Sequence, residues 1–175
     1  MNFIKINFNK GVSLVEIIIY LAIFTVISIL VINSFITTLS SFSTIRTNHE
    51  LLNSGSIAME RISREIRQAK SIDLVNSQTN GGEVLQLNST DNSGNNMVIK
   101  FIKEGNNLNI YKNGTIVGNL LVQNVIVTSI SFDRISTTSE AKSEGVKIKI
   151  VLQDTRSKLN KTANFYNTVI LRGGY

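Results

Sequence analysis

The sequence predicts an α+β protein in which one long amino-terminal helix packs on an antiparallel β-sheet. The first half of this helix is expected to span a membrane, because residues 17–36 (IIIYLAIFTVISILVINSFI) are twenty consecutive residues without a charge. The sheet is expected because the chain after Ala69 forms short alternating runs separated by Asn- and Gly-rich turns.

The composition excludes several classes of chemistry. The 175 residues include no cysteine, no proline, no tryptophan and one histidine. Disulfides, thiolate metal sites, iron–sulfur clusters, cysteine nucleophiles and multi-histidine metal sites are therefore excluded. No nucleophile–base pair can be assembled, so we expect neither an enzyme nor a bound cofactor. Eighteen basic residues against 12 acidic ones give a net charge of +6 with the histidine neutral.

The apolar segment has the length of a membrane anchor. Twenty helical residues at about 1.5 Å each span about 30 Å, which is the thickness of the bilayer hydrocarbon. A cleaved secretory signal has a shorter apolar core followed by a small-x-small site, and a buried core helix would need a larger protein around it. Both readings are less favoured than an anchor. Lys5 and Lys10 precede the segment, so the positive-inside bias places the amino terminus in the cytoplasm and the remainder outside.

Glu16 is the one charged residue between Gly11 and Ile45. A carboxylate costs on the order of 2.5–3.5 kcal/mol at the centre of a membrane helix and less near its end. Glu16 either lies in the headgroup zone or has a partner, and we expect a partner.

The junction Lys10 to Glu16 (KGVSLVE) resembles the leader junction of type IV pilins and type II secretion pseudopilins. The resemblance implies that a prepilin peptidase cleaves after Gly11 and methylates the new amino terminus at Val12. Val12 stands where phenylalanine or methionine is usual. Glu16 is then the fifth mature residue, and the resemblance implies that it pairs with the amino terminus of a neighbouring subunit. Such a pair would fix the axial register of an added subunit.

The chain is thereby divided into four segments. Residues 1–11 are the leader peptide, and residues 12–36 are the hydrophobic transmembrane and assembly helix. Residues 37–70 continue the helix in amphipathic form, and residues 71–175 form the antiparallel β-rich part. The prepilin junction and the apolar helix, about residues 1–40, carry the resemblance clearly.

The helix is expected to run from Val12 to about Ala69, because no proline interrupts it. Thr37–Thr44 is a weak stretch of poor helix formers. Basic residues and a Glu60–Arg64 pair occupy the polar face. One face recurs at spacings of three and four: Leu51, Gly55, Ala58, Met59, Ile62, Ile66 and Ala69.

The β-rich part is expected to contain eight strands. Asn113-Gly114 between two apolar pairs is the firmest hairpin signal, and Asn80-Gly81-Gly82 is expected to be a turn. The predicted strands are Ser71–Val75, Glu83–Asn88, Met97–Lys103, Asn107–Lys112, Thr115–Val117, Asn124–Ile135, Val146–Gln153 and Asn164–Leu171.

The expected function is that of a minor pilin or pseudopilin. The helix end at 61–66 (RISREI) and the later runs 121–125 and 130–132 are similar to those of J-type pseudopilins and W-type minor pilins. The resemblance implies four partners: the prepilin peptidase, other pilin or pseudopilin subunits, an inner-membrane assembly platform and the cytoplasmic membrane. It also implies passage from the cytoplasmic membrane into a surface filament that serves a type IV pilus or type II secretion-like system.

Two alternatives stay open. The protein could be a competence pseudopilin whose outer domain contacts DNA, or a signal-anchored surface protein that never polymerises. The basic residues Arg61, Arg64, Arg67 and Lys70 of the helix, together with Lys142, Lys147, Lys149, Lys158 and Lys161, could meet a phosphate backbone, but a solvated face is the favoured interpretation. His49 is expected to be exposed, and residues 91–96 (DNSGNN) to be a plain loop rather than a calcium site.

Overall fold

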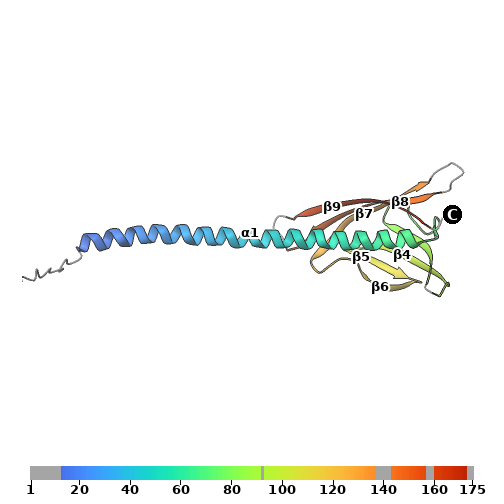
Figure 1. The fold of residues 1–175 in the computed structure, drawn as a ribbon, viewed down its shortest axis with the longest axis horizontal. Helices are drawn as coiled ribbons and strands as arrows, with labels where there is room; N and C mark the ends of the chain where they lie inside the picture. Colours follow the sequence, from blue (N-terminus) through green and yellow to red (C-terminus); the bar gives the residue numbers. More distant parts are fainter. Residues whose placement is uncertain (1–12, 92, 137–142, 157–159, 173–175) are drawn as a thin grey trace, which may run out of the picture. The chain divides into compact units, whose positions relative to one another are not determined.

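A computed structural model describes residues 13–91, 93–136, 143–156 and 160–172. Within them it contains one helix, α1 (Leu14–Gln68), and nine strands (Figure 1). The chain divides into two units, Met1–Ser43 and Thr44–Tyr175, and the boundary falls inside α1. The strands are β1 (Ser71–Ile72), β2 (Asn80–Gly82), β3 (Val84–Thr90), β4 (Asn96–Glu104), β5 (Asn107–Lys112), β6 (Thr115–Asn119), β7 (Val125–Ser136), β8 (Glu144–Asp154) and β9 (Thr162–Ile170).

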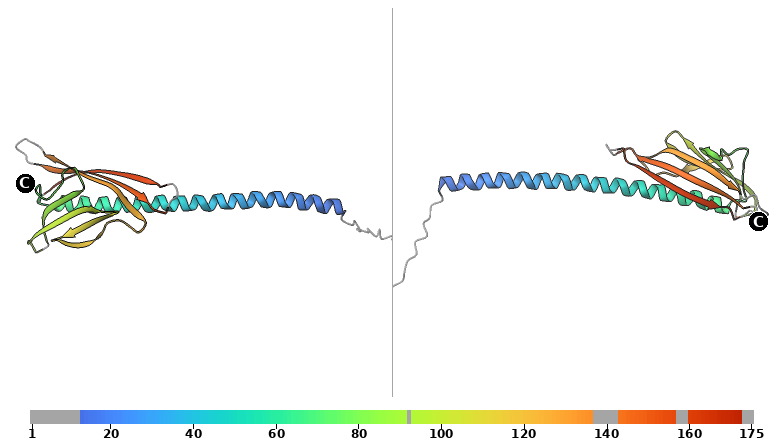
Figure 2. Two further views of the ribbon diagram at one scale, coloured as in Figure 1. Left: turned by 180° about the vertical axis from the view of Figure 1, so that it is seen from behind. Right: turned by 90° about the horizontal axis from the view of Figure 1, so that it is seen from above.

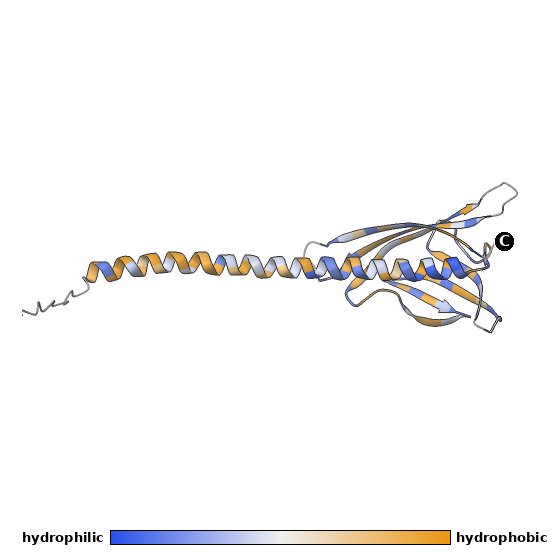
Figure 3. Cartoon of the chain, viewed as in Figure 1, coloured by the Kyte–Doolittle hydropathy of each residue, from blue (hydrophilic) through white to orange (hydrophobic). Residues whose placement is uncertain are grey.

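In the first unit, α1 is mostly apolar from Leu14 to Ile36 and richer in Ser and Thr from Thr37 to Ser43. The large apolar side chains from Leu14 to Phe42 are between 52% and 73% exposed, and Figure 3 shows mainly apolar colour over the first part of the helix and paler colour after it. By length and composition α1 can cross a membrane. This agrees with a single-pass anchor.

The stretch Thr37–Thr44 is helical despite its poor helix formers. Its hydroxyl groups donate to main-chain carbonyls of the preceding turn: Thr37 to Asn33, Thr38 to Ser34 and Ser41 to Thr37, at 2.8–2.9 Å. A hydroxyl bonded in this way needs no other partner. The predicted continuity of the helix is therefore confirmed within the described residues.

In the second unit, α1 has the one buried face that the sequence predicted. All seven residues of the predicted stripe are buried, and Ala58, Ile62, Ile66 and Ala69 are fully inaccessible. The predicted Glu60–Arg64 pair also forms, at 2.6 Å. Each large apolar side chain buried in this way contributes about 1.5–3 kcal/mol.

The strands form two antiparallel sheets. The order of the first is β1-β3-β4-β5-β6, and that of the second is β2-β7-β8-β9. Figure 2 shows both sheets beside the part of α1 that belongs to the second unit. Side chains of this helix and of both sheets form one apolar core. The predicted α+β class is confirmed, with the sheet divided in two.

Two local predictions were wrong. Asn80–Gly82, expected to be a turn, is the edge strand β2, because Asn80 and Gly82 pair with Asp133 and Phe132 of β7. Strand β1 ends at Ile72 rather than at residue 75. Asp73 ends it, because its carboxylate accepts hydrogen bonds from the main chain of residues 75 and 76 and forms a turn.

The predicted Asn113-Gly114 hairpin is confirmed. It joins β5 to β6, and both residues adopt positive φ, 49° at Asn113 and 81° at Gly114. These are the angles of a type I′ turn, which suits the twist of a two-residue hairpin. Asn113 adds a side-chain bond, because its Oδ1 accepts from the main-chain N–H of Val98 at 2.8 Å.

A buried carboxylate joins the helix to the first sheet. Glu65 is on α1 and its side chain is 6% exposed. Its Oε1 lies 2.9 Å from Arg61 Nη2 and 3.5 Å from Lys112 Nζ of β5. Loss of one member of a buried ion pair leaves an uncompensated charge, which costs about 3–5 kcal/mol. Glu65 therefore fixes which helix turn faces β5.

Strand β9 joins the helix to the second sheet. Asn167 Nδ2 donates to Ser63 Oγ at 2.9 Å. The ring of Phe165 lies so close to Gly55 that a Cβ there would come within 2.1–2.6 Å of three ring carbons. Gly55 is required because no side chain fits between the helix backbone and this ring.

We predict that Gly55→Ala destabilises the fold. Alanine favours a helix over glycine by about 1 kcal/mol, but overpacking costs about 1–3 kcal/mol, and here the overlap is with a ring. We expect a net loss of about 1–2 kcal/mol in the free energy of unfolding, measured by urea titration of the full chain in detergent with tyrosine fluorescence. Ser56→Ala, on the exposed neighbouring position, is the control.

Two outcomes show whether the overlap with Phe165 causes the loss of stability. Gly55→Ala combined with Phe165→Leu should regain much of the lost stability, since the smaller side chain removes the overlap. A Gly55→Ala variant as stable as Ser56→Ala would show that Phe165 does not hold β9 on the helix.

Candidate assembly site

Glu16 lies in the first turn of α1. Its main-chain N–H donates to the Ser13 carbonyl at 2.9 Å, and a carboxylate in this turn interacts favourably with the positive end of the helix dipole. Ser13 and Glu16 have the spacing of a capping box, in which the glutamate would turn back toward the helix start. Here the carboxylate instead meets a group one turn further along the helix.

That group is Tyr20. Its hydroxyl donates a hydrogen bond to Glu16 Oε1 at 3.0 Å. Residues four apart face each other on a helix, so the spacing of Glu16 and Tyr20 could have predicted this hydrogen bond. The sequence analysis missed it, because it expected a cation as the partner of Glu16. Among the described residues, no other donor is recorded on this carboxylate.

The two other predicted site residues, Gly11 and Val12, lie outside the described residues. The cleavage and methylation assigned to them stay predictions. What the structure adds is that α1 begins at Leu14, the third residue after Gly11.

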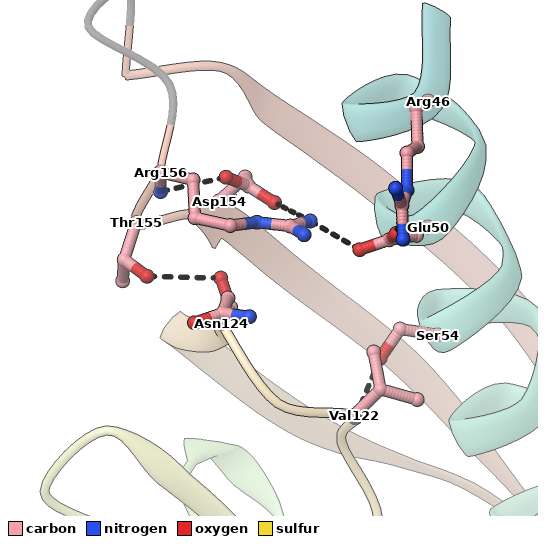
Figure 4. A network of polar contacts seen from close by, with 8 residues as sticks. All are labelled: Arg46, Glu50, Ser54, Val122, Asn124, Asp154, Thr155 and Arg156. Carbon is pink, nitrogen blue, oxygen red and sulfur yellow. Dashed lines mark hydrogen bonds and ion pairs between the residues drawn. The ribbon is translucent and has the colours of Figure 1, made fainter. Parts of the chain in front are cut away.

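A second polar cluster holds the β8 end against α1 in the second unit (Figure 4). The Arg156 guanidinium pairs with Glu50 of the helix and with Asp154 at 3.0 Å. Glu50 also accepts from Arg46 Nε at 3.0 Å. The Arg156 hydrogen bond, followed by that from Arg46, holds the pKa of Glu50 below its ordinary value. Asp154 and then Glu50 raise the pKa of Arg156.

Two further contacts support this cluster. Lys161 Nζ donates to Asn48 Oδ1 at 3.2 Å, and the Val122 N–H donates to Ser54 Oγ at 3.2 Å. Three side chains of one helix segment, Asn48, Glu50 and Ser54, therefore receive groups from segments about 70 to 110 positions later in the chain. These contacts have the character of a structural clamp, because Glu50, Asp154 and Arg156 are paired with one another across the cluster.

A basic cavity of about 390 Å³ lies where α1 ends. Arg64, Arg67 and Arg172 line it, together with Glu60, Ser63, Gln68 and Asn167. Arg64 is neutralised by Glu60, and Arg67 lies in the last helix turn, where a cation is stabilised by the helix carbonyls. No aromatic residue is among the lining residues. The charges of Arg64 and Arg67 are therefore explained by an ion pair and by the helix end, without a bound ligand.

The remaining candidates are surface groups. His49 is exposed, as predicted. The Asp91 carboxylate accepts from the main chain of Ser93 and Asn95 at 2.8 Å, and these bonds lower its pKa. Lys147 and Lys149 are exposed on β8, whereas Lys142 and Lys158 lie outside the described residues.

The chain matches no protein-family model, and no curated protein or solved structure is significantly similar to it. An apolar amino-terminal helix that packs on antiparallel sheet is nevertheless the general architecture of pilin-like proteins.

We predict that the Glu50 clamp makes stability depend on pH. A carboxylate whose pKa is lowered by folding stabilises the fold above its ordinary pKa of 4.5, and this contribution is lost as the pH falls through the folded-state pKa. The difference in unfolding free energy between the parent and Glu50→Gln should be constant from pH 7 to about pH 5 and shrink below it, in urea titrations of the full chain.

Arg156→Gln should weaken this pH dependence most, because Arg156 is the largest cause of the lowered pKa of Glu50. Arg46→Gln is the matched control and should retain most of it, since the Arg46 side chain is 80% exposed. A parent–Glu50→Gln difference that does not change down to pH 3 would contradict the clamp.

Proposed function

We propose that the protein is a prepilin-like subunit, a minor pilin or pseudopilin, which is processed by a prepilin peptidase and assembled through α1 into a type IV pilus or type II secretion-like filament. The observation that carries the proposal is the position of Glu16. It is the lone charge on a helix segment whose other faces are apolar, and it follows Gly11 at the interval that the prepilin junction requires.

The exposed apolar surface supports assembly through the helix. A continuous apolar surface of this extent is not stable in water and must be covered by lipid or by other protein. Lipid tails and neighbouring apolar helices are about equally apolar, so little hydrophobic free energy opposes the transfer from one to the other. The same helix can therefore serve as a membrane anchor and then as the core of a filament.

Glu16 supports a specific register in that filament. After cleavage the new amino terminus is a cation four residues before Glu16, and methylation leaves it cationic. A buried carboxylate without a cation is costly, so subunits that align Glu16 with a neighbour's amino terminus are favoured over subunits that do not. The ion pair would select one axial position out of many that apolar contacts alone would permit.

The second unit supports a structural rather than a catalytic role. Its buried acidic groups Glu65 and Asp154 are paired within the chain. The basic cavity at the end of α1 gives no specific support for DNA contact, because it contains Glu60 and no aromatic lining residue on which a base could stack.

We predict that Gly11→Ala leaves the full-length protein, with its leader, in the membrane. A peptidase that takes the backbone in an extended form close to its catalytic centre has room for glycine and not for a β-carbon. Intact mass and amino-terminal sequence of material purified from its own cells give the answer, with Asn7→Ala as the control. Processing of Gly11→Ala as in the parent would refute the prepilin assignment. A parent protein that still begins at Met1 would identify a signal-anchored protein instead.

We predict that Glu16→Ala is processed normally but enters filaments poorly. The substitution removes the counter-charge for the neighbour's amino terminus and leaves the apolar surface unchanged. The fraction of the chain recovered in sheared filaments, relative to the membrane fraction, should fall on the order of tenfold or more. Incorporation of Glu16→Ala at the parent level would refute the registry role.

A further inference from the structure

Among the described residues, Tyr20 is the hydrogen-bond donor to the carboxylate of Glu16. Its hydroxyl group lies 3.0 Å from Glu16 Oε1, and both side chains are on the exposed surface of the helix. Helix side chains tilt toward the amino terminus, so a long side chain four residues later covers the position before it. A tyrosine at position 20 therefore reaches back to Glu16, and a phenylalanine there would place the same ring without the donor.

The hydrogen bond leaves the carboxylate open to a second donor. A phenol has one proton to donate, whereas a carboxylate has two oxygens and about four acceptor sites. The recorded bond is to Oε1. An ammonium group could therefore approach Oε2 while the phenol stays in place. A tyrosine also combines an apolar ring, which suits lipid, with a polar tip.

We propose that Tyr20 is a positioning residue for Glu16. Its hydroxyl replaces part of the water that the carboxylate loses in the bilayer, and it holds the carboxylate with one oxygen free for the amino terminus of the adjoining subunit. This inference rests on the proposed assembly function, and it adds a residue that the prepilin junction itself does not contain. The competing explanation is that Tyr20 only anchors the helix at the membrane interface, where tyrosine is common.

A spectroscopic measurement tests the contact independently of assembly. The full chain is placed in phospholipid vesicles, and ultraviolet resonance Raman spectra are recorded for the parent, Tyr20→Phe, Glu16→Ala and the double variant. The parent minus Tyr20→Phe difference isolates the Tyr20 phenol. This difference spectrum should show a phenol that donates a hydrogen bond to a carboxylate. The Glu16→Ala spectrum minus that of the double variant should lack this feature. Identical difference spectra in both backgrounds would overturn the proposal.

An assembly measurement tests the positioning role. Tyr20→Phe should be processed normally and should lower the fraction of the chain in sheared filaments, on the order of tenfold. Tyr166→Phe is the matched control, because Tyr166 is an exposed tyrosine on β9 whose ring lies under Lys149. It should assemble like the parent. Parent-level incorporation of Tyr20→Phe would overturn the positioning role.

The two hypotheses fail in different ways. If Glu16→Ala assembles like the parent, the registry role of Glu16 is refuted together with the positioning role, and the Raman spectra still decide whether the contact exists. If Glu16→Ala fails to assemble and Tyr20→Phe assembles normally, only the inference about Tyr20 is refuted. If Tyr20→Phe causes the same fold loss with and without Glu16, Tyr20 acts through the membrane interface and the proposal is wrong.

Discussion

The whole chain depends on one uninterrupted helix whose surface changes character along its length. From Leu14 to Ile36 it is mostly apolar all round, and from Thr44 onward it buries one face and exposes charges on the other. The absence of proline allows both parts to belong to one element. The apolar first part needs lipid or other protein around it. The second part buries its apolar face against the two sheets of the same chain.

Two acidic residues of the second unit differ from Glu16 in the same way. In the second unit, Glu65 is paired with Arg61 and Lys112, and Asp154 with Arg156. Their counter-charges come from the same chain, so they specify how helix and strands fit together. In the first unit, Glu16 is bonded only to a neutral hydroxyl among the described residues. Under the proposed function its counter-charge comes from a neighbouring subunit, whereas the counter-charges of Glu65 and Asp154 join the helix and strands of one chain.

Features set by neighbouring residues could be predicted from the sequence. The buried helix face follows from spacing, and the hairpin at Asn113-Gly114 follows from the positive φ angles that these two residues tolerate. Features set by distant residues could not. Strand β2 exists because Asn80 and Gly82 meet β7 about fifty positions later, and the Glu50–Arg156 pair joins residues 106 positions apart. The Glu16–Tyr20 bond was local and could have been predicted from its spacing.

The apolar surface of α1 is longer than a membrane requires. Apolar side chains remain exposed at Leu39, Phe42 and Ile45, beyond the predicted end of the hydrophobic segment at residue 36. From Leu14 to Phe42, at about 1.5 Å per residue, the apolar part measures on the order of 43 Å, against about 30 Å of hydrocarbon. Thr37, Thr38 and Ser41 lie among these side chains, and their hydroxyl groups bond to carbonyls of their own helix. A helix with this excess either tilts in the bilayer or leaves an apolar turn uncovered. Under the proposed function, packing against a neighbouring apolar helix would cover this excess.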